Sequence, residues 1–257
     1  MVPAVMGILN VTPDSFSDGG RFLDPDLAMA HGLQLVAEGA SIVDVGGEST
    51  RPGAGGVDEA EERRRVLPVI EALTPHVRVS IDTRHRSVAE AAVEAGATLV
   101  NDVSASLWPV AAEGGVGWVA LHMQGEPQTM QQAPRYDDVV SEVRDFLVAR
   151  AERAIAAGVG EVWIDPGIGF GKTQEHNLML LRRLEEIVAS GHGVLVGTSR
   201  KGFLGALTGG APVDDRLEGS LATAVVAAAA GARMIRAHDV LPTVHAMRLV
   251  GEEVDAA

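Results

Sequence analysis

The sequence predicts a single-domain (β/α)8 barrel, an α/β fold of the TIM type, that spans residues 1–257. The chain is 257 residues long, close to the roughly 250 residues that such barrels contain. Short apolar segments alternate with longer amphipathic segments, which implies parallel strands joined by right-handed crossovers. No linker divides the chain. An open Rossmann-like sheet is the alternative fold, and the lack of a GxGxxG motif after the first strand counts against it.

The predicted strands are short apolar runs that stop at a polar residue, a glycine or a turn. They cover residues 5–9, 41–45, 77–81, 98–100, 118–121, 162–164, 194–196 and 234–235. The sixth strand has the clearest stop, because Asp165 is followed by Pro166 and proline cannot continue a central strand ladder.

Amphipathic segments between the strands predict the helices. They cover about residues 24–38, 57–73, 87–96, 109–113, 137–157, 173–184 and 241–250, and further helical segments after the seventh strand are interrupted at residues 209–212. Ser87 and Thr173 are predicted N-caps, and Gly39 is predicted to end the first helix. In the second helix acidic residues precede basic ones, an order that suits the helix dipole.

Composition narrows the classes of function. The chain contains no cysteine, which excludes disulfides, thiolate metal sites and cysteine nucleophiles. The formal net charge of −14 argues against nucleic acid or an anionic membrane as a partner. No apolar run reaches the roughly 18 residues of a membrane-spanning helix, and no signal peptide is recognised. We therefore expect a cytoplasmic protein that acts on small molecules.

Polar side chains stand at several ends of the predicted strands. In a parallel barrel these ends open on one face, where active sites lie. The residues at the ends are Asn10, Gly46, Asp82, Asn101, Met123, Asp165, Gly197 and Arg236. Asp82, Asn101 and Asp165 together suit a neutral ligand rich in N–H donors, such as a fused pyrimidine. Each of them alone would more often be a loop cap, but the three together favour a binding site.

A glycine-rich loop follows the sixth strand. Residues 162–173 read VWIDPGIGFGKT, with glycine at positions 167, 169 and 171. Glycine lets a backbone turn sharply or approach a ligand closely. A tight turn between a strand and a helix would use the same residues, so both interpretations stay open for this loop alone.

Basic residues gather after the second, seventh and eighth predicted strands. They are Arg51, Arg200, Lys201, Arg236 and His238. Barrels often bind phosphate beside the last two of these loops, so we expect a phosphate site there, with solvated surface residues as the alternative. Asn10 could offer one oxygen to Mg²⁺, which keeps several waters and takes ligands from substrate phosphates. Ser199 and Lys201 are too loosely spaced for a nucleophile–base pair, so we expect a site that orients charged leaving groups.

Nine segments carry these residues and their neighbours. They are MGILNVTPDSFSDGG (6–20), GGESTRPG (46–53), SIDT (80–83), NDVSA (101–105), HMQGEPQTM (122–130), DPGIGFGKT (165–173), GTSRK (197–201), GSLATA (219–224) and RAHDV (236–240). Taken in this order they resemble the motifs of the dihydropteroate synthase family of pterin-binding enzymes. The resemblance covers almost the whole chain, and several of the segments are long.

The resemblance implies a homodimeric barrel that condenses p-aminobenzoate with 6-hydroxymethyl-7,8-dihydropterin diphosphate in folate biosynthesis. It implies Mg²⁺ as cofactor, with Asn10 as its ligand. The residues that carry catalysis would be Asp82, Asp165, Lys201, Arg236 and His238. The pterin contacts would be Asp82, Asn101, Asp165 and Lys201, with Met123, Phe170 and Gly197 in the pocket wall. The diphosphate contacts would be Arg51, Arg236 and His238, and Phe16, Thr50, Pro52 and Ser199 would surround p-aminobenzoate.

Two alternatives to this reading differ in class. One is a pterin-binding barrel that transfers a methyl group from a folate to a corrinoid, which would not need the TPDSF and STRPG loops or the SRK run. The other is an inactive paralogue that binds pterin or a partner without turnover, although no motif residue is lost. Two departures from the family pattern are small: residues 104–117 form a slightly short segment, and Ala237 replaces the commoner valine.

Overall fold

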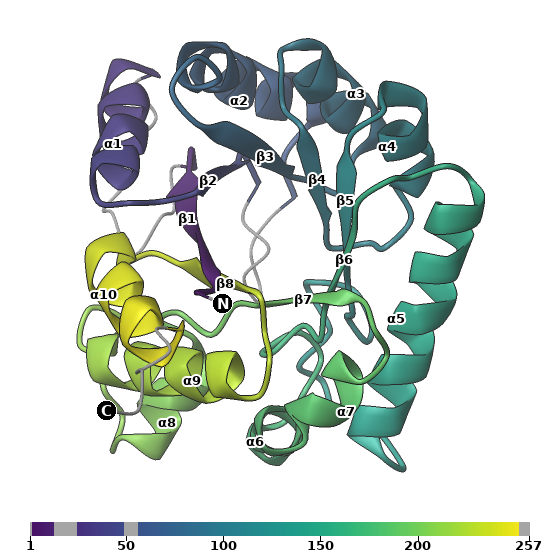
Figure 1. Ribbon diagram of the computed structural model, residues 1–257, viewed down its shortest axis with the longest axis vertical. Helices are drawn as coiled ribbons and strands as arrows, with labels where there is room; N and C mark the ends of the chain where they lie inside the picture. The colour runs from purple at the N-terminus through teal and green to yellow at the C-terminus, as the bar shows by residue number, and fades with distance from the viewer. Residues whose placement is uncertain (1, 13–24, 49–55, 252–257) are drawn as a thin grey trace, which may run out of the picture.

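The computed structural model describes residues 2–12, 25–48 and 56–251. Within these residues, eight parallel strands form a closed barrel in sequence order, β1 to β8, with helices around it (Figure 1). Closure is direct, because β8 pairs with β1 in the register Ala4 to Met234. The predicted (β/α)8 barrel is therefore confirmed, and the alternative of an open sheet is wrong.

The strands lie close to their predicted positions. They are β1 (Ala4–Asn10), β2 (Ile42–Gly46), β3 (Arg78–Asp82), β4 (Leu99–Asp102), β5 (Gly117–Leu121), β6 (Val162–Asp165), β7 (Gly193–Val196) and β8 (Met234–Ala237). All of them are short, as parallel strands buried on both faces usually are.

The helices follow the strands around the barrel. They are α1 (Pro25–Ala37), α2 (Glu59–Leu73), α3 (Arg86–Glu94), α4 (Trp108–Gly114), α5 (Val139–Ala156), α6 (Gln174–Arg182), α7 (Leu184–Val188), α8 (Gly202–Leu207), α9 (Leu217–Ala229) and α10 (Val240–Gly251). Among the residues that the structure describes, no helix is both long enough and apolar enough to cross a membrane.

Most predicted helix ends are confirmed, with two differences. The Thr173 hydroxyl caps α6 by accepting from His176 N, and Gly39 has the left-handed φ of +101°. Ser87 is not an N-cap: α3 already begins at Arg86, and the Ser87 hydroxyl donates to Glu59 on the neighbouring helix. The helix predicted over residues 173–184 is broken at Arg183 into α6 and α7.

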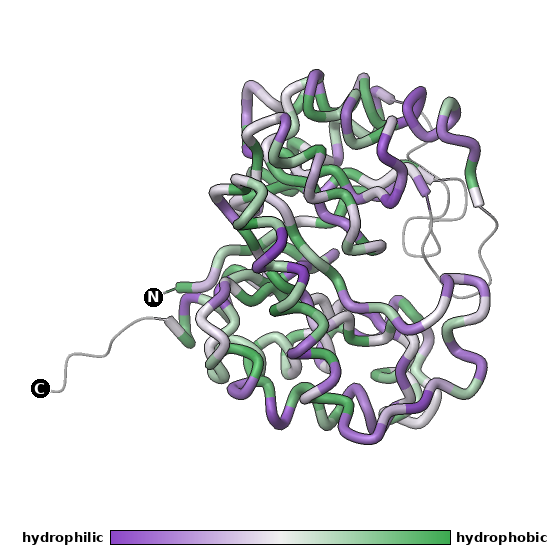
Figure 2. The backbone as a smooth tube through the Cα atoms, turned by 90° about the vertical axis from the view of Figure 1, so that its right-hand side faces the viewer, coloured by the Kyte–Doolittle hydropathy of each residue, from purple (hydrophilic) through white to green (hydrophobic). Residues whose placement is uncertain are grey.

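The barrel has two apolar layers. The larger one lies between the strands and the helices, so apolar segments run through the centre of Figure 2 and hydrophilic ones gather on outer turns. The smaller one fills the lower part of the lumen, meaning the part nearer the amino ends of the strands. Its residues are Met6, Ile42, Leu99, Val119, Leu195 and Met234. Because strand side chains alternate, the next inward positions along several strands lie nearer the carboxyl end of the barrel.

Candidate active site

A cavity of about 680 Å³ opens at the carboxyl ends of the strands. Nine predicted residues line it, namely Asn10, Asp82, Phe170, Gly197, Ser199, Arg200, Lys201, Arg236 and His238. Asn101 and Asp165 are each only 3% exposed. Met123 lies apart, in the wall of a neighbouring pocket of about 410 Å³. The predicted residues Phe16, Thr50, Arg51 and Pro52 fall outside the described residues.

Arg236 connects the buried carboxylate of Asp44 with the partly buried carboxylate of Asp82 at the base of the cavity. Its Nε donates to Asp44 Oδ2 at 2.6 Å, and its Nη2 donates to Asp82 Oδ2 at 2.6 Å. The pKa of Arg236 would be lowered by burial, but the charges of Asp44 and Asp82 raise it above its ordinary value. Arg236 is therefore a fixed positive charge beside the cavity.

Asp44 was not among the predicted site residues. It lies inside β2 and not at its end, and its side chain is completely buried. A charged residue within the apolar run Ile42-Val43-Asp44-Val45 is the signal that could have identified it, because buried charges need partners.

Asp82 and Asp165 both bind protons more tightly than ordinary aspartates. Burial raises the pKa of Asp82 to about 7, helped by the charge of Asp44 and opposed by that of Arg236. Burial also raises the pKa of Asp165, opposed by the charge of Lys201 and by a 2.7 Å hydrogen bond that Gly167 N donates to its carboxylate. Asp82 can thus exchange a proton near neutral pH, and both carboxylates can accept hydrogen bonds from a ligand.

Lys201 reaches back across the cavity to the glycine-rich loop. Its Nζ donates to the backbone carbonyl of Ile168 and lies 4.6 Å from the centre of the Phe170 ring. Burial lowers its pKa to about 8, although the charge of Asp165 opposes this change. Lys201 and Phe170 therefore form one wall of the cavity.

The glycine-rich loop needs its glycines. Gly167, Gly169 and Gly171 have φ values of +65°, +86° and +60°, in the left-handed region. A Cβ at Gly167 would lie 1.9 Å from His122 O, and one at Gly171 would lie 2.2 Å from Gln124 O. The sharp turn and the close backbone approach are both present, and the close neighbour is the segment after β5.

A buried Lys172 joins these same two segments. Its Nζ lies 3.0 Å from His122 Nδ1 and donates to Phe170 O at 2.9 Å. Burial holds the pKa of Lys172 well below its usual range. Burial and the nearby Lys172 charge lower the pKa of His122 to about 3, so this imidazole is neutral at pH 7. Neither residue was predicted to belong to the site.

Three rim residues have partners from the chain itself. Ser199 Oγ lies 3.0 Å from His238 Nδ1 and also accepts from His238 N. Arg200 makes two hydrogen bonds with Asp239, at 2.5 and 3.0 Å. Of the basic residues predicted to gather here, Arg200, Lys201, Arg236 and His238 all line the cavity, and Arg200 also forms an ion pair with Asp239.

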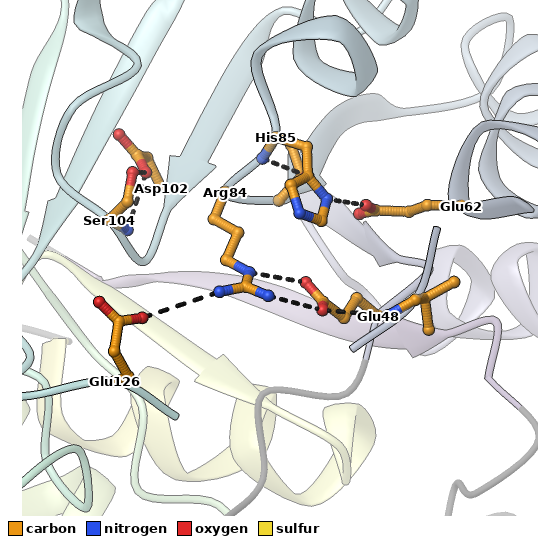
Figure 3. Close-up of polar contacts among 9 residues, drawn as sticks. Glu48, Glu62, Arg84, His85, Asp102, Ser104 and Glu126 are labelled. Atoms are coloured by element: carbon orange, nitrogen blue, oxygen red, sulfur yellow. Dashed lines mark hydrogen bonds and ion pairs between the residues drawn. The ribbon is translucent and has the colours of Figure 1, made fainter. Parts of the chain in front are cut away.

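The described residues contain one group of at least three His, Asp or Glu side chains whose potential metal-ligand atoms lie within 4.8 Å of one another. It consists of Glu48, Glu62 and His85. Figure 3 shows how these side chains are already occupied. Arg84 donates to both oxygens of Glu48 at 3.0 and 3.1 Å, and His85 Nδ1 lies 2.7 Å from Glu62 Oε2. The guanidinium offsets the charge that a cation would need, so we assign this cluster no metal.

Asn10 fits a hard cation better. A Cβ at Gly46 would lie 3.8 Å from Asn10 Oδ1 and 3.7 Å from Asp82 Oδ2, so the two oxygens face the same gap between neighbouring strands. Both residues line the cavity. Asp82 Oδ2 already accepts from Arg236, so the uncharged amide oxygen of Asn10 is the candidate ligand, of the kind that Mg²⁺ accepts when water and substrate phosphates supply the rest.

Comparison with known proteins gives one consistent picture. Residues 6–238 match the family model described as pterin binding enzyme. Dihydropteroate synthase of Mycobacterium leprae is 49% identical, over 96% of this chain and 92% of its own. The structure of Yersinia pestis dihydropteroate synthase in a sulfonamide drug complex superposes with a TM-score of 0.92 at 45% identity, covering 96% of this chain and 93% of that one. Dihydropteroate synthase of Thermus thermophilus in complex with 4-aminobenzoate gives 0.87 at 46% identity, with the same coverage.

Proposed function

The chain belongs to the dihydropteroate synthases of the pterin-binding enzyme family, and we propose that it condenses p-aminobenzoate with 6-hydroxymethyl-7,8-dihydropterin diphosphate in folate biosynthesis. The main support is the cavity, whose lining places the Asp82 carboxylate and the Asn10 amide beside a group of cations, with the buried Asn101 and Asp165 at nearby strand ends. One region suits the N–H-rich face of a pterin, and the other suits a diphosphate. The protein is then a transferase of an alkyl group, and we expect it to act in the cytoplasm.

The pterin would lie over Asp82, Asn101 and Asp165. Carboxylates and an amide oxygen accept hydrogen bonds from ring N–H and amino groups, and a buried site strengthens those bonds. Phe170 and the stem of Lys201 would cover one face of the ring, since Lys201 already lies over Phe170. The rigid loop with Gly167 and Gly169 holds both in place.

The diphosphate would lie on the side of Arg236 and His238, with Arg51 from the second loop. A guanidinium fixed by two carboxylates loses little entropy when it binds an anion, which favours electrostatic stabilisation of a leaving group. Asn10 would hold Mg²⁺, and a bound Mg²⁺ would supply positive charge to the departing diphosphate oxygens.

The p-aminobenzoate would bind beside Ser199, with Phe16, Thr50 and Pro52. In the reaction its amine nitrogen bonds to the pterin methylene carbon, the carbon–oxygen bond to diphosphate breaks with both electrons on oxygen, and the amine loses one proton. Two nearby carboxylates would stabilise positive charge on the methylene, so we propose that the diphosphate leaves first. Exclusion of water from the cavity protects such a cation.

We also propose a homodimer that forms through α9 and its neighbours. The outward face of α9 is apolar: Val225 and Val226 are 36% and 48% exposed. Leu207 of α8 and Leu241 of α10 are 50% and 45% exposed, and the three helices lie on the same side of the barrel (Figure 1). An apolar patch on adjacent surface helices is typical of a protein interface. Light scattering should give twice the mass of one chain.

The direct test is a coupled assay for diphosphate release from the pterin diphosphate, with p-aminobenzoate and Mg²⁺ each added or withheld. Release that requires both is the expected result. Release with Mg²⁺ alone would mean that the leaving-group chemistry operates without the second substrate. No release, with pterin still bound in calorimetry, would contradict the proposal and favour an inactive paralogue.

A further inference from the structure

The carboxylate of Asp44 lies deeper than the residues already assigned to the reaction. Asp44 follows Ile42 by two positions on β2, so it faces the lumen directly above the apolar layer that contains Ile42. Its side chain is 0% exposed. An ionised carboxylate in such a place costs stability unless it is paired, so packing alone does not account for an aspartate at this position.

A single oxygen of this carboxylate makes both of its recorded contacts. Asp44 Oδ2 accepts from Asn101 Nδ2 at 2.9 Å and from Arg236 Nε at 2.6 Å. Within the described residues, Asp44 Oδ1 is buried without a hydrogen-bond partner. Asp44 therefore contacts two residues through one oxygen. Asn101 belongs to the proposed pterin site, and Arg236 belongs to the proposed diphosphate site.

From this geometry we infer that Asp44 is a positioning residue that orients the Asn101 amide and the Arg236 guanidinium for the substrate. The inference rests on the proposed function. A carboxylate can only accept, so it requires the NH2 group of Asn101 and turns Asn101 Oδ1 away from itself, as an acceptor for ligand N–H groups. It also fixes the plane of the Arg236 fork together with Asp82, which receives Nη2 at 2.6 Å.

Asp44 also influences the protonation of Asp82. The charged groups that act on Asp82 are Arg236 from β8, Asp44 from β2, Glu62 from α2, Glu48 after β2 and Lys201 after β7. After burial itself, the charge of Asp44 is the largest of the influences that raise the pKa of Asp82. Removal of that charge should lower the pKa of Asp82 and move the acid limb of pterin binding to lower pH.

The matched control is Asp102, a second fully buried aspartate on β4, two strands away from β2. Its carboxylate accepts from Ser106 N at 2.7 Å, Leu107 N at 2.6 Å and Trp118 Nε1 at 3.1 Å, so its contacts serve the start of α4 and the helix-facing core. Neither aspartate lines the cavity, but Asp44 accepts from the lining residue Arg236, whereas the contacts of Asp102 go to Ser104, Ser106, Leu107 and Trp118. The protein therefore offers Asp102 as a buried aspartate with a structural role, for comparison with the proposed positioning role of Asp44.

The experiment compares Asp44→Asn and Asp102→Asn with the intact protein in pterin affinity, kcat, KM and melting temperature from pH 5.5 to 8.5. Asp44→Asn should lose about 10–100-fold in kcat/KM, as is usual when a group that orients a ligand contact is removed, and its acid limb should move to lower pH. Asp102→Asn should lower the melting temperature and leave the pH profile unchanged. In an Asn101→Ala background, Asp44→Asn should cost less pterin affinity, because the amide that it orients is gone.

A folded Asp44→Asn variant with the intact protein's kcat/KM and acid limb would overturn the inference. Asp44→Ser, which keeps an acceptor without the charge, is the second variant if Asp44→Asn is poorly folded, and the same loss is expected of it. Absence of diphosphate release from the intact protein would instead contradict the proposed function, so the two failures are distinguishable.

Discussion

The two ends of the barrel lumen are built from the same strands and have opposite chemistry. At the lower end, Leu99 on β4 and Met234 on β8 are at most 1% exposed and belong to the apolar layer. Two positions further along the same strands, Asn101 and Arg236 belong to the polar network above it. On each of these strands, the inward-facing residue changes from apolar to polar within two positions.

This difference shows how the fold separates stability from function. Apolar burial below favours folding, whereas buried acids above oppose it unless they are paired. Arg236 satisfies two of those acids and remains next to the cavity. Substitutions below should therefore change mainly the free energy of unfolding, whereas substitutions above should change binding and turnover and, where they break an ion pair, stability as well.

The largest effect is expected from Arg236→Ala. Loss of this charge should lower kcat by about 10²–10³, as for other groups that stabilise charge in a transition state, while pterin affinity falls much less. Steady-state kinetics and pterin calorimetry are the measurements. The control is Arg233→Ala, at the exposed residue directly before β8, which should keep full activity. Near-normal turnover of Arg236→Ala would refute the assignment of the diphosphate site.

Leu99→Ala should produce the reverse pattern. Removal of a completely buried side chain from the lower layer should cost about 2–5 kcal/mol in the free energy of unfolding. Denaturant titration measures this loss, and kcat should stay within about twofold at a temperature where the variant is folded. Asn101→Ala, two positions along β4, should instead weaken pterin binding. If both variants lost the same property, the separation of the two layers would not hold.

The upper layer should also respond to pH. Because the pKa of Asp82 is raised to about 7, pterin binding should strengthen as pH rises through 7 and the carboxylate becomes the acceptor. Stability should change in the opposite sense: a folded pKa above the unfolded one favours folding at low pH, and this contribution is lost as pH rises from about 4 through 7. Melting temperatures of the intact protein and Asp82→Asn at pH 5 and 8 test this, and a constant difference would contradict it.

The smallest effect is expected at Ala237, between two site residues but on the other face of β8. Ala237 is 4% exposed and alternates with Arg236 and His238, so its side chain points away from the lumen. Ala237→Val should cost at most about 1–3 kcal/mol through tighter packing and should leave kcat unchanged. A change in kcat without a change in melting temperature would show that the outer face also contributes to catalysis.

Much of this protein could be predicted from local patterns. Apolar strands that stop at a turn, helices with recognisable ends and glycines at alternate positions gave the barrel and its open face. Asp82, Asn101 and Asp165 were expected to converge, and the basic residues were expected to gather on the rim. Asp82, Lys201, Arg236 and His238 line one cavity, whereas the buried Asn101 and Asp165 lie outside its lining. Such features are local because propensities, caps and turns depend on a few neighbouring residues.

Other features depend on contacts between strands that are far apart in the chain. The Asp44 to Arg236 contact joins residues 192 positions apart, and it exists only because β8 pairs with β1 and β1 pairs with β2. The same is true of Lys172 with His122 and of Ser199 with His238. The sequence by itself determined the elements, their order and the residues at their ends. Only the closed barrel decided which side chains meet, because its register places residues from different strands at one level of the lumen.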